Sequence, residues 1–174
     1  MSELGLIHVY TGNGKGKTTA SLGLALRACG HGFKVAMVQF MKDDPEYGEF
    51  KAAHFLPGFK IIQVGRNDFV DLANPDAVDV QLAREGWRLA KDLLDSREWD
   101  IVILDEINVA MACGLLDTEE IAAFLTAAKR EVEIVLTGRY APEKIIALAH
   151  LVTEMQEVKH PFSTGLEARK GIDY

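Results

Sequence analysis

A glycine-rich segment near the start of the chain carries the residues best suited to chemistry. Residues 11–20 read T-G-N-G-K-G-K-T-T-A, so three glycines alternate with polar residues before a lysine and two threonines. Glycines let successive backbone N–H groups converge on phosphate oxygens, which a side chain at Cβ would obstruct. Lys17 can then reach the phosphates, and the Thr18 hydroxyl is placed to bind Mg²⁺. The pattern predicts a phosphate-binding loop.

The spacing of this loop departs by one residue from the usual pattern, G-x-x-x-x-G-K-[ST]. Counting back from Gly16 places Thr11 at the first position, and the glycine comes one residue later, at Gly12. A glycine-rich turn without a ligand is the alternative, but it leaves the lysine and both threonines unexplained. We therefore predict nucleotide contacts, with the nucleotide placed differently from that of ordinary NTPases. The predicted contacts are Gly12, Asn13, Gly14, Lys15, Gly16, Lys17, Thr18 and Thr19.

Two adjacent carboxylates supply the second half of a nucleotide site. The apolar run at residues 101–104 is followed by Asp105 and Glu106, which fits the Walker B pattern. Alone this pattern is weak, because buried strands often end in an acidic residue, but after a phosphate-binding loop it becomes strong. We predict that Thr18, Asp105 and Glu106 form a Mg²⁺ shell completed by phosphate oxygens.

Two arginines are further candidates for phosphate contacts. Arg139 follows an apolar run at residues 132–137, and a guanidinium pairs bidentately with phosphate oxygens. Arg27 lies on the helix after the loop, off its apolar face. From position alone, a surface role stays open for both. Kinases, ATPases, GTPases and synthetases share such loops, although the absence of an [NT]-K-x-D motif disfavours GTP.

Strands alternating with helices must position these groups. Apolar strands are predicted over residues 6–10, 34–40, 60–64, 99–106 and 132–137, and an edge strand of alternating polarity over 151–158. Helices are predicted over residues 17–29, 49–56, 74–95 and 117–128 and from Pro142 onward, and residues 159–174 as an extended tail. The third helix should begin at Asn74-Pro75 and face inward through Val78, Leu82, Leu89 and Leu93. This order predicts a three-layer α/β P-loop NTPase fold with a mostly parallel sheet of about six strands.

Composition limits the remaining classes. A chain of 174 residues fits a single domain spanning residues 1–174. The net charge of −7 argues against an extended nucleic-acid surface. No signal segment or membrane-length apolar run is present, so we expect a cytoplasmic protein without membrane partners. Cys29 and Cys113 form no C-x-x-C pair and are expected to be buried thiols.

Several segments together resemble the ATP:corrinoid adenosyltransferases of cobalamin biosynthesis and salvage. The similarity runs in order along essentially the whole chain, and the shifted glycine of the loop belongs to it. The segments are T-G-N-G-K-G-K-T-T-A (11–20), A-x-G-H-G (28–32), V-Q-F-M-K (38–42), V-I-L-D-E (102–106), L-T-G-R (136–139) and V-K-H-x-F…G-L-E-A-R-K-G-I-D-Y (158–174).

This resemblance implies transfer of the 5′-deoxyadenosyl group of ATP to the cobalt of a reduced, Co(I) corrinoid, with the whole triphosphate as leaving group. It also implies Mg²⁺ or Mn²⁺, a RecA-like fold, a homodimer, an electron-donating flavoprotein and ATP lying reversed over the loop. Lys17 and Glu106 become the predicted catalytic residues, and Arg27 and Arg139 gain support as nucleotide contacts. Because Co(I) is already nucleophilic, Glu106 should serve the metal rather than take a proton.

One aromatic residue is the predicted corrinoid contact. Relatives carry a G-F-T-W segment whose aromatics pack beside the corrin, and residues 65–69 here read G-R-N-D-F, which leaves Phe69 for this role. Two other functions stay open. A P-loop small-molecule kinase or ATPase would release ADP without corrinoid, and a corrinoid delivery protein would bind ATP tightly without turnover.

Overall fold

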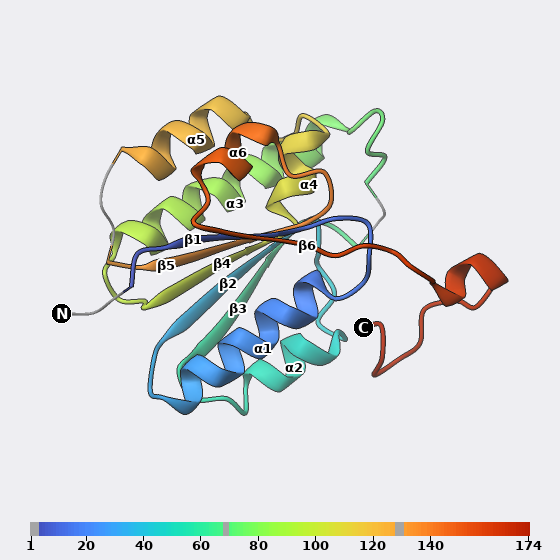
Figure 1. Cartoon of the computed structure of the whole chain (residues 1–174), viewed down its shortest axis with the longest axis horizontal. Helices are drawn as coiled ribbons and strands as arrows, with labels where there is room; N and C mark the ends of the chain where they lie inside the picture. Colours follow the sequence, from blue (N-terminus) through green and yellow to red (C-terminus); the bar gives the residue numbers. More distant parts are fainter. Residues whose placement is uncertain (1–3, 68–69, 128–130) are drawn as a thin grey trace.

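One parallel sheet forms the centre of the molecule (Figure 1). The computed structural model describes residues 4–67, 70–127 and 131–174. The strand order is β3-β2-β4-β5-β1-β6, and all neighbouring strands pair in parallel. The predicted α/β sheet of about six strands is therefore confirmed. The strands are β1 (Ile7–Thr11), β2 (Val35–Phe40), β3 (Phe59–Val64), β4 (Ile101–Asp105), β5 (Glu133–Thr137) and β6 (Leu151–Glu154).

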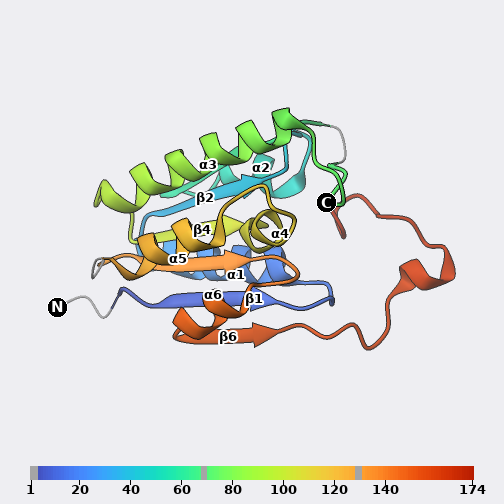
Figure 2. The same ribbon diagram turned by 90° about the horizontal axis from the view of Figure 1, so that it is seen from above.

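Helices cover both faces of the sheet, which confirms the three-layer architecture (Figures 1 and 2). On one face lie α1 (Lys17–Gly30) and α2 (Gly48–Ala53). On the other lie α3 (Ala77–Asp95), α4 (Ile107–Ala112), α5 (Thr118–Thr126) and α6 (Glu143–Leu148). Within the described ranges, no helix has both the length and the apolar character that a bilayer crossing requires.

The central strands are buried along their whole length. Every residue of β2 and β4 is buried, as expected for parallel strands covered on both faces. Two apolar clusters fill the space between the sheet and its helical layers, one around Trp87 and Leu104 and one around Ala25 and Met37. This core holds the carboxyl ends of the strands in a fixed arrangement, and the predicted site lies at those ends.

The start of α3 differs from the prediction. Its N-cap is Asp76 rather than Asn74, because the side chains of Asp76 and Asp79 form a reciprocal capping box. Val78 was predicted to face inward but is 44% exposed. Near this end of the helix, the Arg66 guanidinium pairs with the buried Asp79 at 2.8 Å. The buried face runs through Asp79, Ala83, Gly86, Trp87, Ala90, Leu93 and Leu94.

One helix, one strand and the two cysteines also depart from expectation. The short helix α4 was not predicted, and it follows Glu106 directly from a left-handed N-cap. The edge position of β6 is confirmed, but the strand ends at Glu154 because the next residues turn onto the phosphate loop. Cys29 and Cys113 are free thiols and only partly buried.

The tail, residues 159–174, is not simply extended. It contains a 3-10 turn, Pro161–Thr164, and then folds back. Figure 2 shows it leaving β6, projecting beyond the carboxyl end of the sheet, and returning so that the C terminus lies near α2. It thereby covers the end of the sheet that carries the predicted site.

Candidate active site

The loop between β1 and α1 encloses the side chain of its own lysine. Lys17 Nζ donates to the carbonyl oxygens of Gly12 at 2.8 Å and Gly14 at 2.7 Å, and the residue is only 7% exposed. Burial lowers the pKa of Lys17, while the Glu106 carboxylate acts in the opposite direction. Gly16 is left-handed, with φ 115°, and turns the chain into α1. The unpaired N–H groups of the first turn of α1 therefore adjoin a fixed ammonium group.

The segment after β6 packs against this loop. Gly14 N–H donates to the Met155 carbonyl at 2.6 Å. A Cβ atom at Gly12 would lie 2.4 Å from the same oxygen, and Gly12 has φ 92°. The unusual position of this glycine thus matches a place where neither the backbone conformation nor the space allows a side chain.

We expect Gly12→Ala to lower the stability of the protein and Gly23→Ala to keep or slightly raise it. The left-handed backbone alone costs an alanine about 1–2 kcal/mol, and displacement of Met155 adds to it. Gly23 lies within α1, and a Cβ added there would meet no packed neighbour within 4 Å, so alanine should add up to about 1 kcal/mol of stability. Urea denaturation of both variants measures the difference. Equal midpoints for Gly12→Ala and the wild type would contradict this packing.

Asp105, the last residue of β4, is satisfied by protein groups. Its side chain is fully buried. Oδ1 accepts from the hydroxyls of Thr18 at 2.8 Å and Thr137 at 2.7 Å. Oδ2 accepts from Lys42 Nζ at 2.9 Å and Gln39 Nε2 at 3.2 Å. Since a carboxylate offers about four lone-pair positions, Asp105 fixes its neighbours rather than facing the cleft.

Glu106 instead faces the cleft. Its left-handed backbone, with φ 64°, reverses the chain between β4 and α4, and its N–H donates to Thr137 Oγ1 at 3.0 Å. Burial and the neighbouring Asp105 raise the pKa of Glu106, against the opposing charges of Lys42, Lys17 and Arg139. The side chain is therefore an acidic group surrounded by cations.

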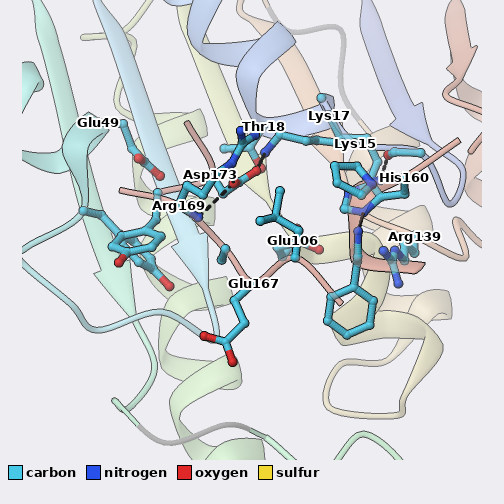
Figure 3. A pocket seen from close by; sticks show the side chains of 18 of the residues that line it. Lys15, Lys17, Thr18, Glu49, Glu106, Arg139, His160, Glu167, Arg169 and Asp173 are labelled. Carbon is cyan, nitrogen blue, oxygen red and sulfur yellow. Dashed lines mark hydrogen bonds and ion pairs between the residues drawn. The ribbon is translucent and has the colours of Figure 1, made fainter. Parts of the chain in front are cut away.

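A cleft of about 450 Å³ joins these groups. In Figure 3, Glu106 lies between Glu49 on one side and Arg139 on the other, with Lys15 and Lys17 above it. Arg139 is exposed at the carboxyl end of β5, as predicted. Several lining residues were not predicted: Lys42, Tyr47, Glu49, and much of the tail. The sequence signal for Lys42 was its place at the end of the V-Q-F-M-K segment.

The tail is attached to the loop by an ion pair. Lys15 Nζ lies 2.7 Å from Asp173 Oδ1, and Arg169 donates to Asp173 from its backbone N–H at 2.9 Å (Figure 3). These contacts, led by the hydrogen bond from Lys15, lower the pKa of Asp173 to about 2. The ring of Tyr174 packs near that of Tyr47, with centroids 6.1 Å apart. The tail is thus part of the site.

Other predicted residues lie outside the cleft. Arg27 is in the last turn of α1, ten residues beyond Lys17, which at about 1.5 Å per residue is roughly 15 Å along the helix. Its charge acts on Tyr10, lowering a pKa that burial raises. Asn13 and Thr19 are exposed and do not line the cleft. The structure therefore does not bring Arg27 to the other predicted contacts.

The predicted corrinoid contact, Phe69, lies outside the described residues.

The fold and the site together define a P-loop nucleotide-binding protein, with the phosphate loop after β1 and the acidic end of β4 on one edge of a parallel sheet. The family model "ATP:corrinoid adenosyltransferase BtuR/CobO/CobP" matches residues 3–174. The chain belongs to this family of enzymes, which transfer an adenosyl group from ATP to a corrinoid. The family predicted from the sequence is thereby confirmed.

Curated relatives are similar along nearly the whole of this chain. Corrinoid adenosyltransferases of Escherichia coli K12 and a Sinorhizobium species are 40% and 39% identical, each over 99% of this chain and over 87% and 81% of their own lengths. The corrinoid adenosyltransferase CobA of Salmonella typhimurium is 38% identical over 99% of this chain and 87% of its own.

Solved structures with distant sequences share the fold. The flagellar accessory protein FlaH of Methanocaldococcus jannaschii has a TM-score of 0.56 and 17% identity, covering 87% of this chain and 71% of its own. The KaiC-like protein PH0186 of Pyrococcus horikoshii has a TM-score of 0.56 and 15% identity, covering 88% and 73%. At this identity the likeness concerns architecture alone.

Proposed function

We propose that the cleft binds the triphosphate of ATP and holds the 5′ carbon where a Co(I) corrinoid attacks it. The observation that carries this proposal is that the cationic side chains of Lys17, Lys42 and Arg139 line the same cleft as the glycine-rich loop and the Glu106 carboxylate. These cationic side chains can bind a polyanion, such as triphosphate, that leaves as a single group. The adenosine then lies at the mouth of the cleft.

The reaction requires little acid–base catalysis by the protein. The cobalt lone pair forms the Co–C5′ bond, the C5′–O bond breaks, and its electron pair leaves on triphosphate. No proton is removed from the nucleophile, so Glu106 needs no role as a base. The residues act by positioning ATP and by stabilising negative charge that grows on the leaving oxygen.

The open oxygen donors fit a divalent cation that arrives with the nucleotide. In the described ranges, no cluster of three or more His, Cys, Asp or Glu side chains could hold a metal by itself. The Thr18 hydroxyl donates a hydrogen bond to Asp105, so the lone pairs of the Thr18 oxygen stay free. Glu106 faces the same space. Mg²⁺ is usually held by one or two carboxylates together with substrate phosphates. When bound, Mg²⁺ or Mn²⁺ would neutralise phosphate charge, with Thr18 and Glu106 as its protein ligands and Asp105 as their support.

The proposal is tested by nucleotide turnover with and without chemically reduced corrinoid. We expect the absorbance of an adenosylated corrinoid to appear only when ATP, Mg²⁺ and Co(I) corrinoid are all present. A kinase or ATPase would release ADP from ATP alone. ADP release at the same rate without corrinoid would therefore reject the proposal.

Lys42 is expected to contact the triphosphate in addition to neutralising Asp105. Burial alone lowers the pKa of Lys42, but Asp105 outweighs this effect and raises it, so the side chain is cationic at the cleft wall. We predict that Lys42→Ala weakens binding of inorganic triphosphate about tenfold, as expected for one charge-assisted contact of roughly 1.5 kcal/mol. Calorimetric titration with triphosphate and Mg²⁺ measures this change.

A double variant separates contact from neutralisation. In Lys42→Ala/Asp105→Asn no buried carboxylate is left without its cationic partner, because an uncharged amide replaces it. If Lys42 touches the triphosphate, affinity stays low in the double variant, whereas full recovery would show that Lys42 serves only Asp105. Lys60→Ala, a change at an exposed lysine of β3, is the matched control.

Four further properties are part of this proposal. One domain over residues 1–174 and a cytoplasmic location are expected from the sequence, whereas a homodimer and a flavoprotein reductant are implied by the family. The exposed edge strand β6 supports the homodimer, because Leu151 and Val152 are 41% and 42% exposed there. An exposed apolar edge strand readily pairs with another chain.

A further inference from the structure

The cleft has one wall of a different character from the rest. Its aliphatic and phenyl side chains come from the tail, namely Pro161, Phe162, Leu166 and Ala168. The remaining lining consists mainly of glycines and charged or polar side chains, which come from the loop, from the ends of the strands and from the tail itself, where Glu167, Arg169 and Asp173 lie. A ligand in this cleft therefore meets the lysines of the loop on one side and, on the tail, apolar side chains among charged ones.

Contacts within the tail hold this apolar surface in place. The Phe162 N–H donates to His160 Nδ1 at 3.2 Å, and Thr164 Oγ1 donates to the Pro161 carbonyl at 2.7 Å, which closes the 3-10 turn. Farther along, the Lys15–Asp173 ion pair ties the returning chain to the phosphate loop. The local hydrogen bonds thus fix the shape of the turn, and the ion pair holds the chain that follows it against the loop.

Phe162 lines the cleft and yet is 74% exposed, so its ring lies at the mouth rather than inside. A group that lies across the mouth can cover this ring, whereas a group bound deep among the lysines cannot. The corrin of the second substrate is a broad, flat and largely apolar macrocycle. It must approach the 5′ carbon from outside, because the triphosphate occupies the charged interior.

We propose that the tail forms the corrinoid-binding wall of the site, with Phe162 as its main contact and Leu166 beside it. This assignment rests on the proposed function, since it requires the triphosphate to lie on the loop. The corrin covers the exposed phenyl ring, and removal of that apolar area from water provides the binding energy.

Two matched variants test the assignment. Phe162→Ala should raise the KM for reduced corrinoid about tenfold, as expected when a phenyl ring is no longer buried by a ligand. The KM for ATP should change less than about twofold. The thermal midpoint should shift by less than a few degrees, roughly as for other surface substitutions. Phe55→Ala, which removes an 87% exposed ring that does not line the cleft, should leave both KM values unchanged.

A binding titration keeps this test separate from turnover. Absorbance changes of a Co(II) corrinoid, titrated with the ATP-loaded enzyme, report the contact without any transfer step. We expect weaker binding for Phe162→Ala only, and recovery in Phe162→Tyr. Unchanged corrinoid binding in Phe162→Ala, or a higher KM for ATP alone, would overturn the assignment and place the adenine there instead. Failure of the proposed function would appear differently, as loss of corrinoid adenosylation in the wild type.

Discussion

Replacing Lys17 with alanine will lower the rate of adenosyl transfer at least about a hundredfold while the chain still folds. Lys17 is held within the loop by two carbonyl oxygens, so its charge is already oriented before the nucleotide binds. Removing one such preorganised charge costs on the order of 3 kcal/mol in the transition state. The loss should fall mainly on kcat, because negative charge on the leaving triphosphate grows during the reaction.

Single-turnover measurements at saturating ATP and reduced corrinoid determine this loss. Lys60→Ala removes an exposed lysine from β3 and serves as the control for general charge effects. Circular dichroism establishes whether the Lys17 variant is folded, since the change also leaves the Gly12 and Gly14 carbonyls without their donor. A folded Lys17→Ala protein with wild-type kcat would remove Lys17 from the catalytic residues.

Glu106→Gln will abolish most of the activity and at the same time stabilise the ligand-free protein at neutral pH. The amide keeps the shape of the side chain but loses the charge that the proposed cation needs, so we expect a loss of about a hundredfold or more. Mn²⁺ titration in the presence of ATP, followed by electron paramagnetic resonance, should show weaker cation binding. Glu106→Ala should lose activity to a similar extent.

The stability gain follows from the raised pKa of Glu106. A carboxyl whose pKa is higher in the folded than in the unfolded state favours folding at low pH, and this contribution is lost as pH rises through the folded pKa. At higher pH the wild type must bury a charged carboxylate, and the glutamine variant does not. The unfolding free energy of the variant should therefore exceed that of the wild type increasingly as pH rises above about 4.5, the ordinary pKa of glutamate. Parallel denaturation curves at pH 5 and pH 8 measure it. An equal advantage at both pH values, or none, would contradict the burial described for this group.

Local patterns in the sequence were sufficient to predict the central strands, the phosphate loop and the acidic end of β4. Each of these features is encoded by neighbouring residues, such as the four apolar residues that precede Asp105 in β4 or the lysine that follows Gly16. The glycine shift was visible too, although its reason was not. Only the structure shows that the Met155 carbonyl, from the far end of the chain, occupies the space beside Gly12.

The features that were missed depend on contacts between distant segments. The tail has no hydrophobic period, and it is held by contacts with distant residues, such as the ion pair between Asp173 and Lys15 and the packing of Tyr174 near Tyr47. The first turn of α3 buries Asp79, which pairs with Arg66, and exposes Val78, whereas Leu93 is buried as predicted. Arg27 stays a predicted nucleotide contact, and its spacing from the loop made it the weaker of the two arginines: ten residues of helix place it in the last turn of α1.

The identity of the inorganic product tests the central claim most directly, because only a site that grips the triphosphate as a whole releases it whole. Phosphorus NMR of a reaction containing ATP, Mg²⁺ and Co(I) corrinoid should show one triphosphate for each adenosylated corrinoid formed. Pyrophosphate with phosphate, or ADP, formed in step with the corrinoid product in place of triphosphate would contradict the account.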